Sequence, residues 1–178
     1  QLINGTSGHR TIREGMATEQ ILNWLEKQGI DNYAYRSLVF DYASLGMMPP
    51  VWDSEVINFV ASVVVQAKPE ITEFIEGAIK NDYEEEGFEQ RLKKIADIFF
   101  VSSGRTAEDF KFVFPLKDMT KYEVMKALPP ELLALTWSCR YPEIGAPYTF
   151  VRCHKCPQCN TIDKIIDEHP GKFDDYMF

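Results

Sequence analysis

All four cysteines of this chain lie near its C-terminus, and their spacing is the strongest constraint on its fold. Cys139 is followed by Cys153, Cys156 and Cys159 in the pattern C-x13-C-x2-C-x2-C. A C-x2-C turn bends the backbone so that two thiolates converge on one ion, and three cysteines at this spacing can supply three corners of a tetrahedron. Cys139 would supply the fourth. The spacing therefore predicts one structural zinc ion, because four thiolates leave no open position for water or substrate.

Other chemistries of closely spaced cysteines are weaker explanations of this pattern. Disulfides belong to oxidising compartments, and this acidic chain shows no charged-then-apolar signal segment at its printed start. An iron–sulfur cluster also uses closely spaced cysteines, and the spacing alone does not exclude it. A redox C-x2-C pair would leave two cysteines without a role. With four cysteines present, His154 and His169 are expected to be bystanders, while Arg152 and Lys155 would offset part of the thiolate charge.

The charge and composition of the chain argue against two kinds of partner, nucleic acids and membranes. The net charge of −8 argues against nonspecific binding of nucleic acid, which depends on neutralisation of phosphates by Lys and Arg. No apolar run approaches the roughly 20 residues that span a bilayer, so no membrane partner and a cytoplasmic location are expected. The chain begins at Gln1 without a methionine, and residues 1–3 resemble the end of a strand. We therefore expect a segment to precede them.

Apolar patterns alternate along the chain in a way that predicts a mixed α/β fold. Helices are predicted at residues 11–28, 55–67, 88–100 and 121–128, and strands at 37–40, 74–79 and 111–114. Gly29 is the expected stop of the first helix, Thr120 is the expected cap of the last, and residues 80–87 are an expected polar loop. Many β-branched residues lie in 55–67, so a strand is a competing assignment there. Alternating strands and helices favour a mostly parallel sheet with helices on both faces, which is a three-layer Rossmann-like arrangement.

Two segments near the cysteines resemble the 7-cyano-7-deazaguanine synthases. Leu135-Thr-Trp-Ser-Cys139 and the three later cysteines are similar to the family's T-W-S-C segment and its C-x2-C-x2-C motif, with a longer spacer and with Arg140 in place of the usual tyrosine. Upstream, Pro115–Val124 resembles the family segment P-L-x-x-L-[ST]-K-x-E-I. It places Lys121 at a helix start beside a strand end, where a lysine can meet phosphate or carboxylate groups. A solvated surface lysine is the alternative.

A third segment, Gly77–Tyr83, resembles the family's G-x4-D-[YF] at a strand end. In the family this loop approaches the substrate base, so the resemblance implies that the Asp82 carboxylate accepts hydrogen bonds from the ring donors. The acidic run Glu84–Glu86 that follows also suits a plain surface loop. The match at Gly8–Arg10 with Glu14 to the family's G-Q-x-H-x-x-E is weaker. The printed sequence contains no S-G-G-x-D-S run, the loop that binds pyrophosphate in the PP-loop superfamily.

The resemblance implies a PP-loop (adenine nucleotide alpha-hydrolase-like) fold, with residues 1–134 as part of the α/β domain and 135–178 as a zinc-binding segment packed on it. It implies an ATP-dependent enzyme that converts a 7-deazaguanine carboxylate to a nitrile in queuosine biosynthesis. Gly77, Asp82 and Lys121 are then the expected substrate- or nucleotide-binding residues, with catalytic residues unidentified. ATP would bind only if a PP-loop were supplied upstream, and a 7-deazapurine would be the small-molecule partner.

Two other functions are compatible with these motifs. A catalytically inactive relative would use the zinc loop as a rigid surface for binding or assembly. An unrelated zinc-ribbon-like binding protein is the third hypothesis, and the similarity of Pro115–Val124 to the family argues against it. Either the enzyme or its inactive relative could form a homo-oligomer or could require a missing N-terminal segment that carries the absent loop.

Overall fold

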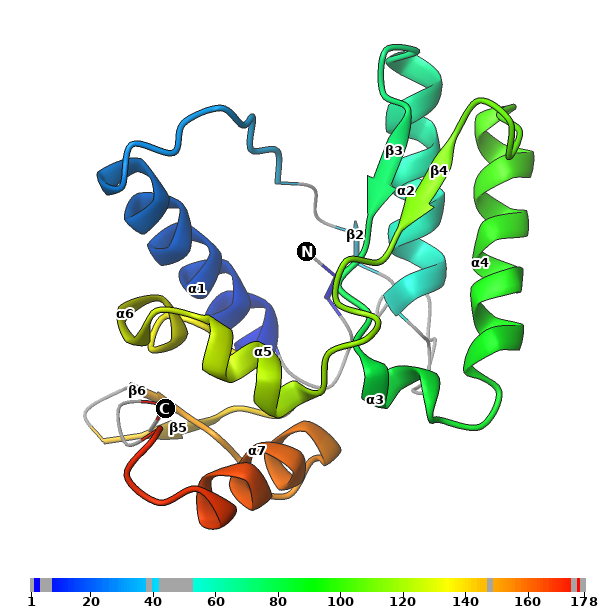
Figure 1. Ribbon diagram of the computed structural model, residues 1–178. Helices are drawn as coiled ribbons and strands as arrows, with labels where there is room; N and C mark the ends of the chain where they lie inside the picture. Colours follow the sequence, from blue (N-terminus) through cyan, green and yellow to red (C-terminus); the bar gives the residue numbers. More distant parts are fainter. Residues whose placement is uncertain are drawn as a thin grey trace. The chain divides into compact units, whose positions relative to one another are not determined.

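The computed structural model describes residues 2–3, 8–37, 40–41, 53–146, 149–173 and 176. The chain divides into two compact units, one formed by Gln1–Pro49 with Met125–Phe178 and the other by Pro50–Val124. The boundary between them falls inside helix α5 (Lys121–Ala127), which is labelled in Figure 1. The expected division into residues 1–134 and 135–178 stays a prediction.

The first unit contains a parallel strand pair and the longest described helix. Strand β1 (Leu2–Ile3) pairs with β2 (Phe40–Asp41), and α1 (Gly8–Lys27) lies between them in the sequence. The end of α1 is a Schellman motif, in which the Ile30 N–H donates to the Leu25 carbonyl at 3.0 Å and the Gly29 N–H to the Glu26 carbonyl at 2.9 Å. Gly29 has a φ of 75°, which glycine adopts without steric cost. The predicted helix and its glycine stop are confirmed.

The C-terminal part of the first unit supports the cysteines. It consists of α6 (Pro130–Leu133), β5 (Glu143–Gly145), β6 (Thr149–Val151) and α7 (Pro157–Glu168). Strands β5 and β6 are antiparallel, with Ile144 opposite Phe150. Helix α7 begins at a proline, which suits the first helical position because that residue needs no hydrogen-bond donor. Its buried face carries Cys159, Ile162 and Ile165.

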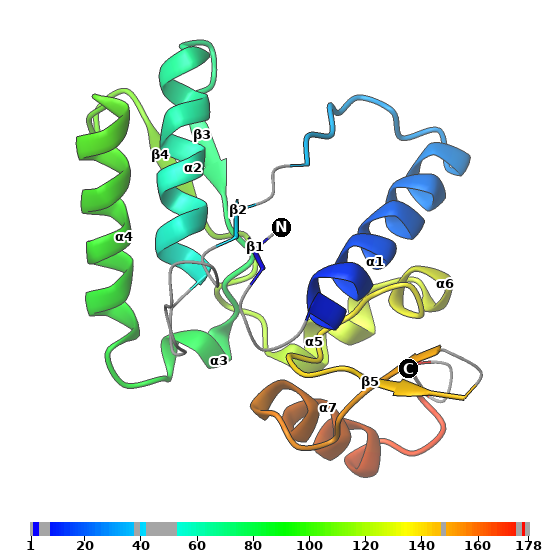
Figure 2. The same cartoon turned by 180° about the vertical axis from the view of Figure 1, so that it is seen from behind.

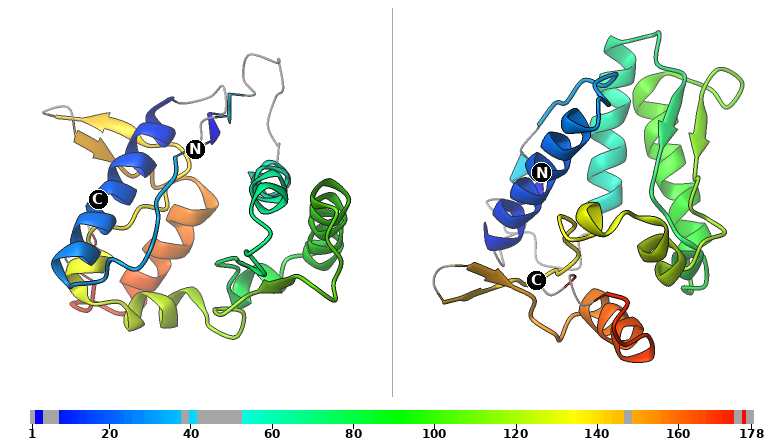
Figure 3. Two further views of the ribbon diagram at one scale, coloured as in Figure 1. Left: turned by 90° about the horizontal axis from the view of Figure 1, so that it is seen from above. Right: turned by 60° about the vertical axis from the view of Figure 1, so that its left-hand side comes forward.

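The second unit is a parallel strand pair covered by two helices. Its elements are α2 (Asp53–Ala67), β3 (Glu73–Ile75), α3 (Lys80–Tyr83), α4 (Phe88–Ser103) and β4 (Lys111–Val113). Strands β3 and β4 are parallel, and Phe74 lies opposite Phe112. Figures 1 and 2, which view the chain from opposite sides, show α2 and α4 side by side on one face of this pair. Figure 3 shows the two helices end-on from above.

Aromatic side chains form the core of the second unit. Phe99 of α4 is fully buried and packs with Val65 of α2 and with Phe110. Its ring centroid lies 4.5 Å from that of Phe110 and 5.1 Å from that of Phe112, the latter in an edge-to-face arrangement. Truncation of a buried phenylalanine costs about 3–5 kcal/mol. This cluster therefore holds α2 and α4 against the strands.

The mixed α/β class predicted from the sequence is confirmed. The helices predicted at 55–67 and 88–100 exist with slightly wider bounds, so the competing strand assignment for 55–67 is wrong. The strands predicted at 74–79 and 111–114 were too long, because β3 ends at Ile75 and β4 ends at Val113. The strand predicted at 37–40 shares Phe40 with β2, and its residues 38 and 39 lie outside the described part. Each sheet among the described residues has two strands, and the wider three-layer sheet stays a prediction.

Candidate functional site

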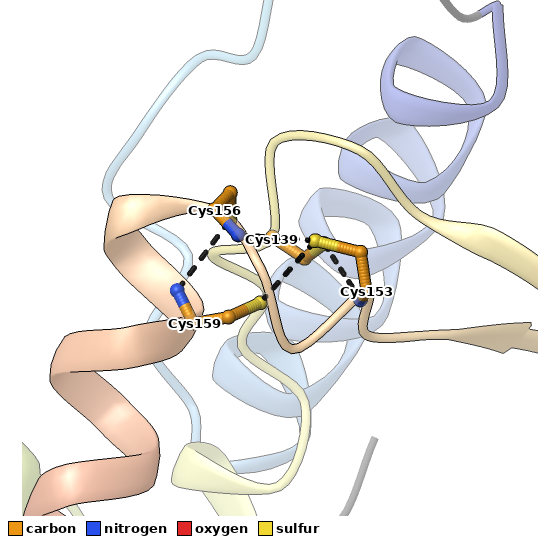
Figure 4. A group of neighbouring side chains, drawn as sticks. All are labelled: Cys139, Cys153, Cys156 and Cys159. Atoms are coloured by element: carbon orange, nitrogen blue, oxygen red, sulfur yellow. Dashed lines mark hydrogen bonds between the residues drawn. The ribbon is translucent and has the colours of Figure 1, made fainter.

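The four cysteines converge in the C-terminal part of the first unit. Cys139 precedes β5, Cys153 follows β6, Cys156 caps α7, and Cys159 lies in the first turn of that helix (Figure 4). All four side chains are buried, and all are free thiols rather than disulfides. Their sulfur atoms lie within 4.8 Å of one another, so the group can hold one metal ion. Sequence spacing predicted this convergence correctly.

Backbone N–H groups point at the sulfur atoms. The N–H of Cys153 donates to Sγ of Cys139 at 3.3 Å, that of Cys156 to Sγ of Cys153 at 3.4 Å, and that of Cys159 to Sγ of Cys156 at 3.4 Å. The Arg140 N–H donates to the Cys156 sulfur at 3.5 Å. Hydrogen bonds to an ionised acceptor favour its charged form, and the N-terminus of α7 adds partial positive charge. These N–H groups thus offer hydrogen bonds to the sulfur atoms once the thiols have lost their protons to a bound ion.

The thiols of Cys139 and Cys153 differ in acidity. Burial raises the pKa of Cys139 to about 12, with backbone hydrogen bonds from Cys153 and Tyr141 acting against it. Burial also works to raise the pKa of Cys153, but backbone N–H groups of Lys155 and Cys156 hold it down to about 7. A divalent ion removes the proton from each ligating thiol, so metal binding here releases protons and strengthens as pH rises.

The buried side chain of Arg152 contacts the backbone of the cysteine loop. Arg152 donates from Nη2 to the Cys159 carbonyl oxygen at 3.2 Å and forms an ion pair with Asp163. Asp163 also lies 2.9 Å from Nδ1 of His154, whose φ of 52° is the positive value required by the turn after Cys153. The ring of His154 is therefore engaged with Asp163, and neither it nor His169 belongs to the described metal-ligand group. Lys155 is exposed and pairs with Glu143 at 3.4 Å.

Trp137 connects the cysteine cluster to α1. Its ring packs against the buried cysteines, and Nε1 donates to the Cys139 carbonyl oxygen at 3.1 Å. The guanidinium of Arg13, on α1, lies 4.5 Å from the centroid of the Trp137 ring. This cation–π contact gives the T-W-S-C segment a structural role beyond supplying one ligand. Sequence analysis did not identify Arg13 or Asp163, because their partners are distant along the chain.

The other predicted site residues meet at one edge of the β3–β4 pair. Both connecting loops leave the carboxyl ends of these parallel strands, where ligands bind in open α/β sheets. Asn81 accepts the backbone N–H of Lys121 at 3.0 Å, and Lys80 donates its N–H to the Met119 carbonyl at 2.9 Å. Burial lowers the pKa of Lys121, and the nearby Asp82 carboxylate acts in the opposite direction. The structure thus brings Asp82 and Lys121 together, while their role in binding stays a prediction.

Asp82 and Gly77 differ in what the fold itself requires. Asp82 accepts the Ile79 N–H at 2.8 Å and so caps the four-residue helix α3, which lies where the sequence predicted a loop. Gly77 has no positive φ, and a Cβ added there would meet no atom within 4 Å. Asp82 therefore has a structural use in addition to its predicted one, whereas a glycine at 77 is not demanded by the described structure.

One cavity lies away from these residues, in the first unit. It is lined by Met125, Lys126, Leu128, Pro130, Leu133, Lys172, Phe173 and Tyr176. Its lining is mainly apolar, and it contains none of the residues predicted to bind substrate. A cleft between Asp82 and Lys121 stays a prediction.

No protein-family model, curated protein or solved structure matches this chain. None of the described helices is both long and apolar enough to cross a membrane.

Proposed function

We propose that Cys139, Cys153, Cys156 and Cys159 bind one structural zinc ion. The observation that carries this proposal is the convergence of four buried sulfur atoms within 4.8 Å, with backbone N–H groups that donate to the sulfurs of Cys139, Cys153 and Cys156. Four thiolates from two adjacent loops are typical of closed zinc sites, in which the ion stabilises the fold and takes no part in a reaction. The role of this ion would be to fix the C-terminal loop.

We further propose that the chain is a relative of the 7-cyano-7-deazaguanine synthases, acting on a 7-deazaguanine carboxylate in the cytoplasm. Support comes from the adjacency of Gly77–Tyr83 and Pro115–Val124, the two segments that resemble the family, at one edge of the β3–β4 pair. Within this proposal, Asp82 accepts donors of the base, and Lys121 binds a carboxylate or phosphate. The three-layer PP-loop sheet, and with it ATP binding, would need a strand and loop of the S-G-G-x-D-S type from upstream or from another chain.

A binding or assembly module is the second candidate. It is favoured by one observation: Asp82 is already used as a helix cap through its contact with the Ile79 N–H. A module of this kind would retain the zinc loop and the β3–β4 edge for stability and would lack turnover.

Calorimetry with 7-carboxy-7-deazaguanine separates the two candidates. The enzyme-like proposal expects binding that weakens by about tenfold or more in Lys121→Met, since a hydrogen bond to a charged group contributes about 1.5–3 kcal/mol. Lys117→Met, at an exposed position in the loop that precedes α5, is the matched control and should leave affinity unchanged. ATP should bind this chain weakly or not at all by itself. Absence of binding of the carboxylate, or equal affinity in both variants, would leave the module as the better account.

A further inference from the structure

The buried face of α2 is unexpectedly polar. Asn58, Ser62 and Val65 lie at helical spacing and point inward, and Asn58 and Ser62 have no exposed surface. Several large apolar side chains of the same helix are exposed instead, namely Ile57, Phe59, Val63 and Val64. Burying an amide costs free energy unless its hydrogen bonds are replaced. Residues that lower the stability of a fold, such as a buried asparagine, are expected mainly where they serve a function.

The hydrogen bonds of this face are incomplete. Ser62 donates its hydroxyl to the Phe59 carbonyl at 2.6 Å, and Asn58 donates from Nδ2 to the Ser54 carbonyl at 3.0 Å. Among the described residues, Oδ1 of Asn58 is buried and has no hydrogen-bond partner. Most buried polar atoms in proteins do have one. Asn58 therefore presents an acceptor to a group that the described residues do not supply.

Glu76 presents a second acceptor of the same kind. It follows β3 directly, and its backbone N–H continues the ladder by donating to Val113 at 3.0 Å. Its Oε2 is buried without a partner in the described part of the chain. Burial raises the pKa of the Glu76 carboxyl, while a hydrogen bond from the Asn58 side chain lowers it. Asn58 and Glu76 are therefore in contact, and one unpartnered oxygen of each lies in the same region.

This region belongs to the carboxyl edge of the β3–β4 pair. Burial raises the pKa of Tyr83, and the charges of Glu76, Asp118 and Asp82 raise it further. The carboxylates of Glu76 and Asp82 are thus both close enough to Tyr83 to raise its pKa. Both unpartnered oxygens lie where ligands of parallel α/β sheets bind.

We propose that Asn58 Oδ1 and the Glu76 carboxylate bind a small ligand through a pair of N–H donors, such as an amidine or the 2-aminopyrimidinone edge of a heterocycle. The two protein atoms can only accept, so the ligand must donate. A hydrogen bond to an ionised carboxylate is charge-assisted and stronger than a neutral one, and the Asn58 carbonyl oxygen supplies the second acceptor. The inference stands apart from the proposed substrate, although 7-deazaguanine carries such an edge.

Ligand-detected NMR with two probes of this class tests the inference directly. Benzamidine is the cationic donor pair, 2-aminopyrimidin-4-one is the neutral one, and pyrimidin-4-one, which lacks the amino group, is the control compound. We expect at least one donor-pair probe to bind about tenfold more tightly than the control compound. That preference should be lost in Glu76→Gln and in Asn58→Leu. It should persist in Glu73→Gln on the same strand and in Ser62→Ala on the same helix face, because the Ser62 hydroxyl already has its partner.

Stability without ligand distinguishes a binding role from a structural one. If the Glu76 carboxylate is kept for a ligand, Glu76→Gln should raise the unfolding midpoint at pH 8 while probe binding is lost, because its ionisation opposes folding. Unchanged probe binding in Glu76→Gln would overturn the inference, as would failure of every donor-pair probe to bind at millimolar concentration. Binding of these probes without binding of 7-carboxy-7-deazaguanine would uphold this site and refute the proposed substrate.

Discussion

Replacement of Cys159 by serine should remove a substantial part of the stability that the proposed zinc ion confers. Cys159 is 1% exposed, and its sulfur lies 4.0 Å from that of Cys153. Structural zinc sites in small domains contribute about 10–16 kcal/mol of apparent binding free energy, so an equal share for one of four thiolates is about 2.5–4 kcal/mol. Serine also leaves a buried hydroxyl without its metal, which costs roughly a further 1–3 kcal/mol. Against a typical total stability of about 5–15 kcal/mol, this loss should unfold the C-terminal part of the chain.

The assay is urea unfolding of Cys159→Ser and of the unchanged chain, each with zinc and with a chelator. Trp137 packs on the cysteine cluster and is one of three tryptophans. With Trp24→Phe and Trp52→Phe introduced in both proteins, its fluorescence reports the C-terminal part, and circular dichroism reports the helices. The matched control is Val65→Ala in the core of the second unit, which should lose about 2 kcal/mol in both conditions. The reasoning is refuted if Cys159→Ser gains as much stability from zinc as the unchanged chain does.

Three further predictions concern residues around the two sites. Arg152→Met should weaken zinc binding by about ten- to a hundredfold, because it removes the hydrogen bond from Arg152 to the Cys159 carbonyl oxygen. Competition with a chromophoric chelator measures this affinity, and an unchanged value would show that Arg152 does not position the cysteine loop. Glu76→Gln should be more stable than the unchanged chain at pH 8 but not near pH 3, because the raised pKa of Glu76 means that its ionisation opposes folding as pH rises through that pKa. If thermal unfolding gives the same stability difference between Glu76→Gln and the unchanged chain at every pH, the pKa of Glu76 is not raised and the prediction is wrong. Gly77→Ala should change stability by less than about 0.5 kcal/mol, since an added Cβ meets open space, and a large loss in thermal unfolding would show that the local backbone is wrong.

The parts of the fold that sequence predicted well depend on local signals. The helix cap at Thr120 is one example: its backbone N–H and hydroxyl both contact the Glu123 carboxylate at 2.7 Å, and its hydroxyl accepts the Glu123 N–H at 3.3 Å. This reciprocal capping box is visible in four consecutive residues. The Gly29 stop and the cysteine spacing are local in the same sense.

The parts that sequence did not predict depend on distant partners. Helix α3 is only four residues long, and it is held by the Asp82 cap and by the bond from Lys80 to Met119 in another loop. Helix α2 is apolar on more than one side, so periodicity alone gave no means of choosing its inner face. The buried Asn58 and its contact with Glu76 followed only from the packing of α2 on α4 and the strands. The signal available in the sequence was a single asparagine in a run of apolar residues.

Metal analysis of the purified chain tests the central claim most directly. Protein produced without added metal should contain one zinc per chain by elemental mass spectrometry, and chelation should release four titratable thiols, one for each of the four buried cysteines. Cys139→Ser should reduce the zinc content under the same conditions. Iron accompanied by a visible absorption band, or a metal-free chain with two disulfides, would contradict the account.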